Sequence, residues 1–144
     1  MIACIVTGHG EFSLGLKDAL EMIAGPQELF EAIPFTRDET TDAFEVKLVE
    51  AIKHLTEQAE GLLIFTDLKG GTPFKIAMTH AIGQENTIVL TGTNLPALIE
   101  SIGGRLMTDN VENLAHALQI SPDCQLEVVQ LKTVQEEGID SEGI

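Results

Sequence analysis

The chain has 144 residues, a length typical of a single domain. Hydrophobic residues make up 44% of it and charged residues 22%, which is an ordinary composition for a globular protein. Its 23 acidic residues against 8 lysines and arginines give a formal net charge of −15, which argues against nucleic acid as a partner and suits a basic protein surface. No apolar run approaches the ~20 residues of a membrane span, two cysteines are too few for a disulfide framework, and the first residues do not resemble a secretory leader. We therefore expect a cytoplasmic protein.

Short apolar runs predict strands at five places along the chain: residues 2–6, 29–35, 61–66, 87–90 and 126–134. The segments between them have helical periodicity, which is clearest over residues 42–58. The apolar positions of that segment recur three or four apart and define one face: Phe44, Leu48, Ile52 and Leu55. Weaker helical patterns cover residues 15–24 and 111–118, and a helix start is expected at Asn94, which precedes a leucine and a proline.

Alternation of strands and helices predicts the α/β class, with an open, mainly parallel sheet flanked by helices on both faces. The expected strand order is 2-1-3-4. The final segment, residues 125–134, mixes polar and apolar positions as an edge, antiparallel or dimer-exchanged strand does. It closes a domain of residues 1–134, and the acidic residues 135–144 are expected to form a loosely ordered tail.

Two predicted strands end in polar residues that could carry chemistry. The first strand leads into Thr7-Gly8-His9-Gly10 and the third leads into Asp67, and in the order 2-1-3-4 these strands are neighbours at a crevice. A neutral imidazole is nucleophilic near pH 7, and a carboxylate that binds one ring nitrogen leaves the other nitrogen free. His9 and Asp67 therefore predict a carrier or general-base pair, although a loop histidine is also often a surface or packing group.

The segment after Asp67 resembles an anion-binding turn. Gly70 and Gly71 allow a close approach of the backbone, and Thr72 followed by Pro73 is typical of an N-cap and first helical residue. The N–H groups and dipole of such a helix start favour a phosphoryl group. The alternative is a tight strand-to-helix turn without a ligand.

Other kinds of site have little support in the sequence. His54, His80 and His116 lie in predicted helices without a second metal ligand one turn away, so we expect structural or surface roles for them. The chain has no HExxH or CxxC motif, no P-loop, no GxGxxG fingerprint and no GxSxG elbow. We expect neither a metal nor a cofactor.

Three stretches in this order and spacing resemble one family: "IVTGHG", "LLIFTDLKGGTPFKIA" and "GTNLPALIE". They are similar to the enzyme IIA domain of the mannose family of the bacterial sugar phosphotransferase system. The resemblance implies that His9 accepts a phosphoryl group from the phosphocarrier HPr and donates it to an enzyme IIB. It also implies that Asp67 orients His9 and that Gly70, Gly71 and Thr72 border the phosphoryl group.

The same resemblance implies an assembly. Members of this family are homodimers that exchange a C-terminal strand, and residues 125–134 stand where that strand would be. Without an attached IIB domain or linker, the chain is expected to use IIB as a separate polypeptide and the membrane components IIC and IID indirectly. Phe12 could contact a docked partner or be buried as a helix-entry staple.

Other functions stay open at this point. A phosphotransfer subunit of a dihydroxyacetone kinase would share the fold and an early active histidine, although "GGTPF" matches the sugar-transport branch better. A regulatory module could use phosphorylation of His9 as a sensory signal. A histidine-based hydrolase is disfavoured because no second acid–base or metal set is visible, and no residue pattern predicts which sugar is transported.

Overall fold

Four parallel strands form the centre of the computed structural model, which describes residues 1–131. The strands are β1 (Ile2–His9), β2 (Phe30–Phe35), β3 (Gly61–Thr66) and β4 (Thr87–Leu90). Their order is β2-β1-β3-β4, and each pairing between neighbours is parallel. The predicted class and strand order are therefore confirmed.

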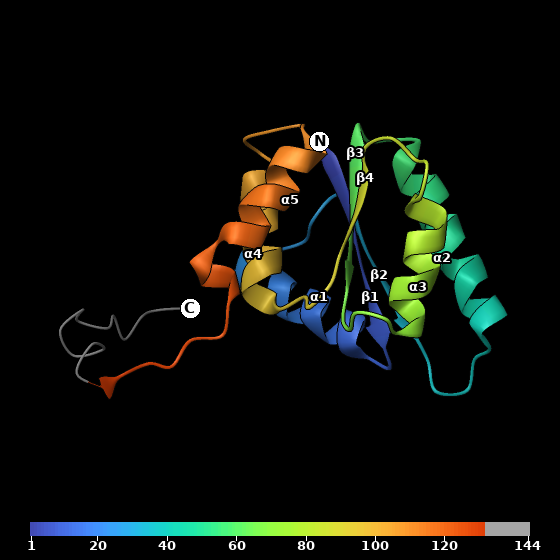
Figure 1. Ribbon diagram of the computed structural model, residues 1–144, viewed down its shortest axis with the longest axis horizontal. Helices are drawn as coiled ribbons and strands as arrows, with labels where there is room; N and C mark the ends of the chain where they lie inside the picture. Colours follow the sequence, from blue (N-terminus) through green and yellow to red (C-terminus); the bar gives the residue numbers. More distant parts are fainter. Residues whose placement is uncertain (132–144) are drawn as a thin grey trace.

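Helices cover both faces of the sheet (Figure 1). One face carries α1 (Phe12–Ala24), α4 (Leu95–Gly104) and α5 (Val111–Ile120), and the other carries α2 (Thr41–Thr56) and α3 (Thr72–Ala81). Side chains of β1 alternate between two hydrophobic clusters, with Ile2, Cys4 and Val6 in one and Ala3 and Ile5 in the other. Because both faces are buried, the strand is apolar at successive positions rather than at every second one.

The predicted helix over residues 42–58 is α2, and its start is set by a side-chain cap. The Thr40 hydroxyl accepts a hydrogen bond from the Ala43 N–H at 3.1 Å. The inward face buries Phe44, Leu48 and Leu55 as predicted, together with Ala51, whereas Ile52 of the predicted face is only partly buried.

β1 is longer than its apolar run predicts, since it continues through Thr7 and Gly8 to His9. Thr7 is fully buried although it is polar, because its hydroxyl donates to the Ile33 carbonyl at 2.6 Å. Helix α1 likewise begins at Phe12, three residues before the predicted start. The strand therefore delivers His9 directly to the carboxyl edge of the sheet.

The predicted strand over residues 126–134 is not formed in the described chain. Residues 125–130 have no regular secondary structure, and this segment extends away from the sheet in Figure 1. A strand needs a hydrogen-bonding neighbour, and the sheet within residues 1–131 contains no fifth strand. The rest of the predicted strand and the expected tail at 135–144 lie outside the described residues. Among residues 1–131, none of the helices has the length and hydropathy of a membrane-spanning segment.

Candidate functional site

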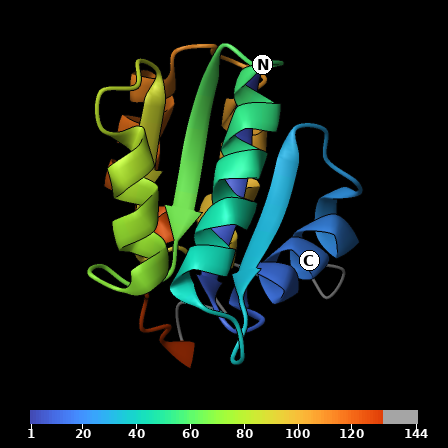
Figure 2. The same cartoon turned by 90° about the vertical axis from the view of Figure 1, so that its right-hand side faces the viewer.

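His9 and Asp67 meet at the carboxyl edge of the sheet. His9 is the last residue of β1, and Asp67 follows the end of the neighbouring strand β3. The loops after β1, β2 and β3 all lie at this same end, which is the lower end in Figure 2. Parallel strands place their carboxyl ends on one side, so residues 58 positions apart in sequence come into contact.

One carboxylate oxygen of Asp67 fixes both the backbone and the ring of His9. Oδ2 lies 2.9 Å from the His9 backbone nitrogen and 2.8 Å from ring atom Nδ1. The other oxygen, Oδ1, accepts the Leu68 N–H at 2.8 Å. When the Nδ1–H group donates a hydrogen bond to the carboxylate, the lone pair of the neutral ring is on Nε2.

Asp67 is held in its ionised form. Partial burial acts to raise its pKa, but hydrogen bonds from the His9 backbone, the His9 ring and the Leu68 N–H outweigh burial and leave the pKa below its usual value. The Asp67 side chain is 14% exposed, whereas that of His9 is 48% exposed. The pair therefore combines a shielded negative charge with a half-exposed imidazole.

Two glycines allow this close arrangement. A Cβ atom on Gly71 would lie 2.8 Å from His9 Cε1 and 3.6 Å from Nε2, so the imidazole rests against the Gly71 backbone. A Cβ atom on Gly8 would lie 2.6 Å from Phe12 Cδ1 and 2.9 Å from Asp67 Cγ. Any larger residue at either position would displace a member of the site.

The start of helix α3 differs from the prediction by one residue. Gly71, in extended conformation, is the N-cap and makes no side-chain cap, whereas Thr72 is the first helical residue and Pro73 follows it. The cap carbonyl of Gly71 accepts from the Lys75 N–H at 2.9 Å, so the backbone alone begins the helix. The predicted N-cap role of Thr72 is therefore wrong.

Backbone donors at this helix start are available to a ligand. Within residues 1–131 the N–H groups of Thr72 and Phe74 have no protein acceptor, and Pro73 has no N–H. Gly70 adopts a φ of +85°, which favours glycine there. The positive end of the helix dipole thus lies beside Nε2.

The imidazole also lies beside the end of β2 and the loop that follows it. The rings of His9 and Phe35 have centroids 5.9 Å apart at an interplanar angle of 57°, and the Gly10 N–H donates to the Phe35 carbonyl at 2.8 Å. A depression of about 510 Å³ lies here, lined by His9, Gly10, Glu11, Phe35, Thr36 and Arg37. Sequence reasoning missed the contribution of this loop, although the predicted order already placed strand 2 beside strand 1.

Phe12 is half-buried rather than displayed. It packs against the cluster of α1, α4 and α5 and touches the space that Gly8 leaves free. The apolar side chains exposed near the site are instead Leu14, in the first turn of α1, and Leu68, next to Asp67, with exposed fractions of 43% and 61%. No motif distinguished these two leucines in the sequence.

The other histidines pair with carboxylates or face outward. His54 Nδ1 lies 3.2 Å from Glu31 Oε1, and His80 Nε2 lies 2.8 Å from Glu45 Oε2. His116 is exposed on α5. Residues 1–131 contain no group of three or more His, Cys, Asp or Glu side chains that could hold a metal ion.

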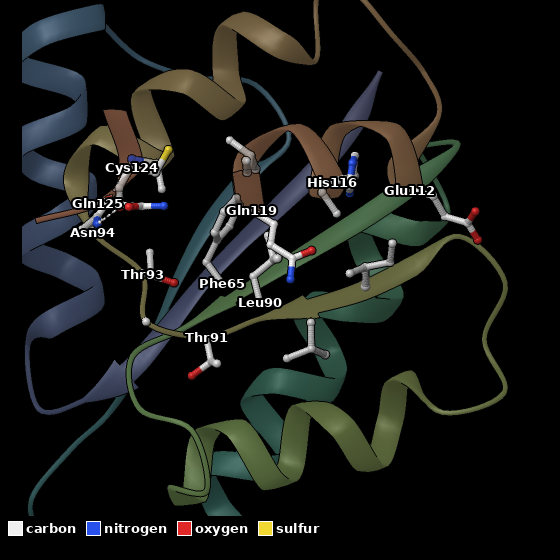
Figure 3. A pocket seen from close by; sticks show the side chains of 16 residues that line it. Phe65, Leu90, Thr91, Thr93, Asn94, Glu112, His116, Gln119, Cys124 and Gln125 are labelled. Atoms are coloured by element: carbon white, nitrogen blue, oxygen red, sulfur yellow. Dashed lines mark hydrogen bonds between the residues drawn. The ribbon is translucent and has the colours of Figure 1, made fainter. Parts of the chain in front are cut away.

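A second cavity, of about 570 Å³, lies between β4 and α5 and shares no lining residue with the depression at His9 (Figure 3). Phe65 and Leu90 line its sheet side and Gln119 its helix side. Asn94, the N-cap of α4, donates a hydrogen bond to the Cys124 carbonyl at 2.7 Å, and both residues line the cavity.

Comparison with known proteins identifies the family. A family model described as "EIIA-man: PTS system fructose IIA component" matches residues 3–119. The chain belongs to the mannose family of phosphotransferase-system enzyme IIA components. Enzyme IIA components are phosphotransferases of sugar transport, so the resemblance found in the sequence is confirmed at this level.

Individual relatives of this enzyme IIA component agree with that assignment. It is 30% identical to the fructose-specific EIIA component of Bacillus subtilis over 146 residues, 99% of each chain. It is 33% identical to the sorbose-specific EIIA component of Lacticaseibacillus casei over 96 residues, 67% of this chain and 68% of the relative. The crystal structure of an EIIA component from Streptococcus agalactiae matches with a TM-score of 0.78 and 30% identity, covering 92% of this chain and 99% of that one.

Proposed function

We propose that this enzyme IIA component carries a phosphoryl group on Nε2 of His9, taking it from HPr and passing it to a separate enzyme IIB during sugar uptake. The observation that carries the proposal is the 2.8 Å contact between His9 Nδ1 and Asp67 Oδ2. This contact supports a tautomer in which Nδ1 carries the proton and Nε2 carries the nucleophilic lone pair.

The transfer needs alignment and charge stabilisation more than any further reactive group. The Nε2 lone pair attacks phosphorus, and the bond between phosphorus and the donor atom of HPr breaks, with its electron pair returning to HPr. The His9 ring becomes positive, and ionised Asp67 stabilises that charge. The free N–H groups of Thr72 and Phe74, beside Gly70 and Gly71, would bind the phosphoryl oxygens. Donation to IIB reverses these steps.

The direct test is incubation of the full chain with radiolabelled phosphoenolpyruvate, enzyme I and HPr. We expect label on the wild type and on a His116→Ala control, whose exposed histidine is on α5, and none on His9→Ala. Label that persists on His9→Ala would rule out the proposed carrier residue.

The acceptor separates the alternatives. Transfer of label from phosphorylated His9 to a cognate IIB supports sugar transport, and transfer to a dihydroxyacetone kinase supports the related phosphotransfer subunit. Transfer to neither, with binding of the phosphorylated form to a regulator, supports a sensory module.

Docking of both partners would take place on the exposed apolar residues around His9. We propose Leu14 and Leu68 as contacts, with half-buried Phe12 supporting α1 from below. A Leu68→Asp variant should lower the rate of transfer from HPr without changing the thermal midpoint, since Leu68 is 61% exposed. Such docking would take place in the cytoplasm. This chain would not contact the membrane components IIC and IID directly, because the phosphoryl group would pass first to IIB.

The assembly is proposed to be a homodimer. Strand β4 is at one end of the sheet order, a cavity lies beside it, and Leu126 and Val128 of the C-terminal segment are exposed. Residues 125–134 would then pair with β4 of a second copy and complete a domain of residues 1–134. Light scattering of the full chain should give the dimer mass, and a chain ending at Cys124 should be monomeric. A monomeric full chain would contradict this assembly.

A further inference from the structure

Arg37 is the positively charged side chain in the depression beside His9. Of the six residues that line this depression, Glu11 is the one carboxylic acid. Arg37 is exposed, and within residues 1–131 it forms no salt bridge. Lys53, Lys69 and Lys75 also form no salt bridge within these residues, but Arg37 is the one of these four cations that lines the depression beside His9.

The loop that carries Arg37 is fixed by other groups. Glu39 Oε1 accepts the Thr36 N–H at 2.8 Å and the Lys47 ammonium at 2.9 Å, and Lys47 also donates to the Pro34 carbonyl at 2.8 Å. Burial acts to raise the pKa of Glu39, but the hydrogen bond from Lys47 and those from Thr36 outweigh it and lower the pKa. The carboxylate of Glu39, in the same loop as Arg37, is therefore already paired with Lys47.

The same loop is tied to the end of β1. The Gly10 N–H donates to the Phe35 carbonyl at 2.8 Å, and the Phe35 ring packs against the imidazole of His9. Phe35 in turn packs on Phe44 of α2, with ring centroids 5.1 Å apart. The backbone next to Arg37 is thus held at a constant place relative to the ring that would be phosphorylated.

The unphosphorylated site gives Arg37 little to bind, whereas the phosphorylated site would give it a strong partner. A phosphoryl group adds a charge of roughly −1.5 to −2 close to the side chains of Asp67 and Glu11, and the Asp67 carboxylate repels it. A guanidinium presents donors in a planar fork that matches phosphate oxygens, and it stays charged at any physiological pH. A cation at this position would therefore stabilise the phosphorylated form more than the free form.

We propose that Arg37 binds the phosphoryl group on His9 and thereby sets the phosphoryl-transfer equilibrium between HPr and this chain. The inference rests on the proposed function, because it requires phosphorylation of His9. The loop between β2 and α2 would then supply a positive charge that the site residues of β1 and β3 do not provide. Arg37 would retain the phosphoryl group until IIB replaces HPr at the docking surface.

The test is the equilibrium constant for transfer from phosphorylated HPr to the full chain, measured for the wild type, Arg37→Ala and Arg37→Lys. We expect Arg37→Ala to shift this constant toward HPr by roughly tenfold, the effect of one exposed charge-assisted hydrogen bond, and Arg37→Lys to shift it less. Lys53→Ala, which also removes an exposed positive charge but near the C-terminal end of α2, is the matched control and should leave the constant unchanged.

An equilibrium constant distinguishes phosphoryl binding from docking. A residue that only contacts HPr changes the forward and reverse rates equally and leaves the constant unaltered. The pKa of the phosphoryl group, read from its phosphorus NMR shift, gives a second readout. Arg37→Ala should raise that pKa, because a nearby cation favours the dianion.

The two possible failures are distinguishable. If wild-type chain takes no label from HPr, the proposed function fails and this inference fails with it. If wild type and Arg37→Ala are both labelled with the same equilibrium constant and the same phosphoryl pKa, His9 remains the carrier and the role of Arg37 is overturned.

Discussion

Replacement of Asp67 by asparagine is a sharp test of how the histidine is held. The carboxylate accepts three N–H groups, two from His9 at Oδ2 and one from Leu68 at Oδ1. An amide has only one acceptor oxygen. If that oxygen faces His9, the NH₂ group opposes the Leu68 N–H; if the amide is flipped, the NH₂ group faces His9 and favours the tautomer with the proton on Nε2. Either orientation weakens the nucleophile.

The magnitude follows from the bond that is lost. A hydrogen bond to a charged group is worth about 1.5–3 kcal/mol, and each 1.4 kcal/mol is about a factor of ten in rate. We therefore expect Asp67→Asn to slow phosphoryl transfer from HPr by roughly 10- to 100-fold. The fold should be retained, because the substitution conserves the volume of the side chain.

The assay is rapid quench of phosphoryl transfer from phosphorylated HPr, with circular dichroism to verify folding. Asp18→Asn removes an exposed charge from α1, makes no contact with His9, and should transfer at the wild-type rate. If Asp67→Asn transfers within about twofold of wild type, the carboxylate neither selects the tautomer nor stabilises the ring charge, and the mechanism proposed for His9 is refuted.

Three further predictions concern stability. Gly8→Ala should lower the free energy of unfolding in urea by about 1–3 kcal/mol, because the new Cβ would lie 2.6 Å from Phe12 Cδ1. At Gly103 a new Cβ would have no atom within 4 Å, so Gly103→Ala should leave the free energy of unfolding unchanged or raise it. Equal urea midpoints for the two variants would contradict this prediction. Arg105→Leu should cost at least about 2 kcal/mol, because this buried guanidinium donates to three backbone carbonyls and one side-chain amide; an unchanged midpoint would show that water replaces it. Burial raises the pKa of Asp67 and hydrogen bonds lower it more strongly, so the ionised carboxylate stabilises the fold fully above its usual pKa of 3.8, and this stabilisation is lost as pH falls through the lower pKa of the folded state. The difference in free energy of unfolding between wild type and Asp67→Asn should therefore narrow over that pH range. A difference that stays constant with pH would refute the lowered pKa.

The strands and helices were predictable because their pattern is a local property. The runs at 61–66 and 87–90 coincide with β3 and β4, and the face of α2 follows from spacing along one helix. The end of β1 was less predictable, because a buried threonine reads as polar until its partner carbonyl is known. The N-cap of α3 was misassigned because a glycine in extended conformation serves as well as a threonine side chain when the backbone supplies the bond.

The sequence by itself indicated the family and the α/β class, and it predicted His9 as the phosphoryl carrier with Asp67 as its partner, since these residue types and their spacing are specific. The tertiary structure decided what surrounds them. It placed Phe35 against the imidazole, Arg37 in the same depression and Gly71 under the ring, and it left residues 125–130 unpaired. These contacts join loops that are distant in the chain, and only the packing of parallel strands brings such loops to one edge.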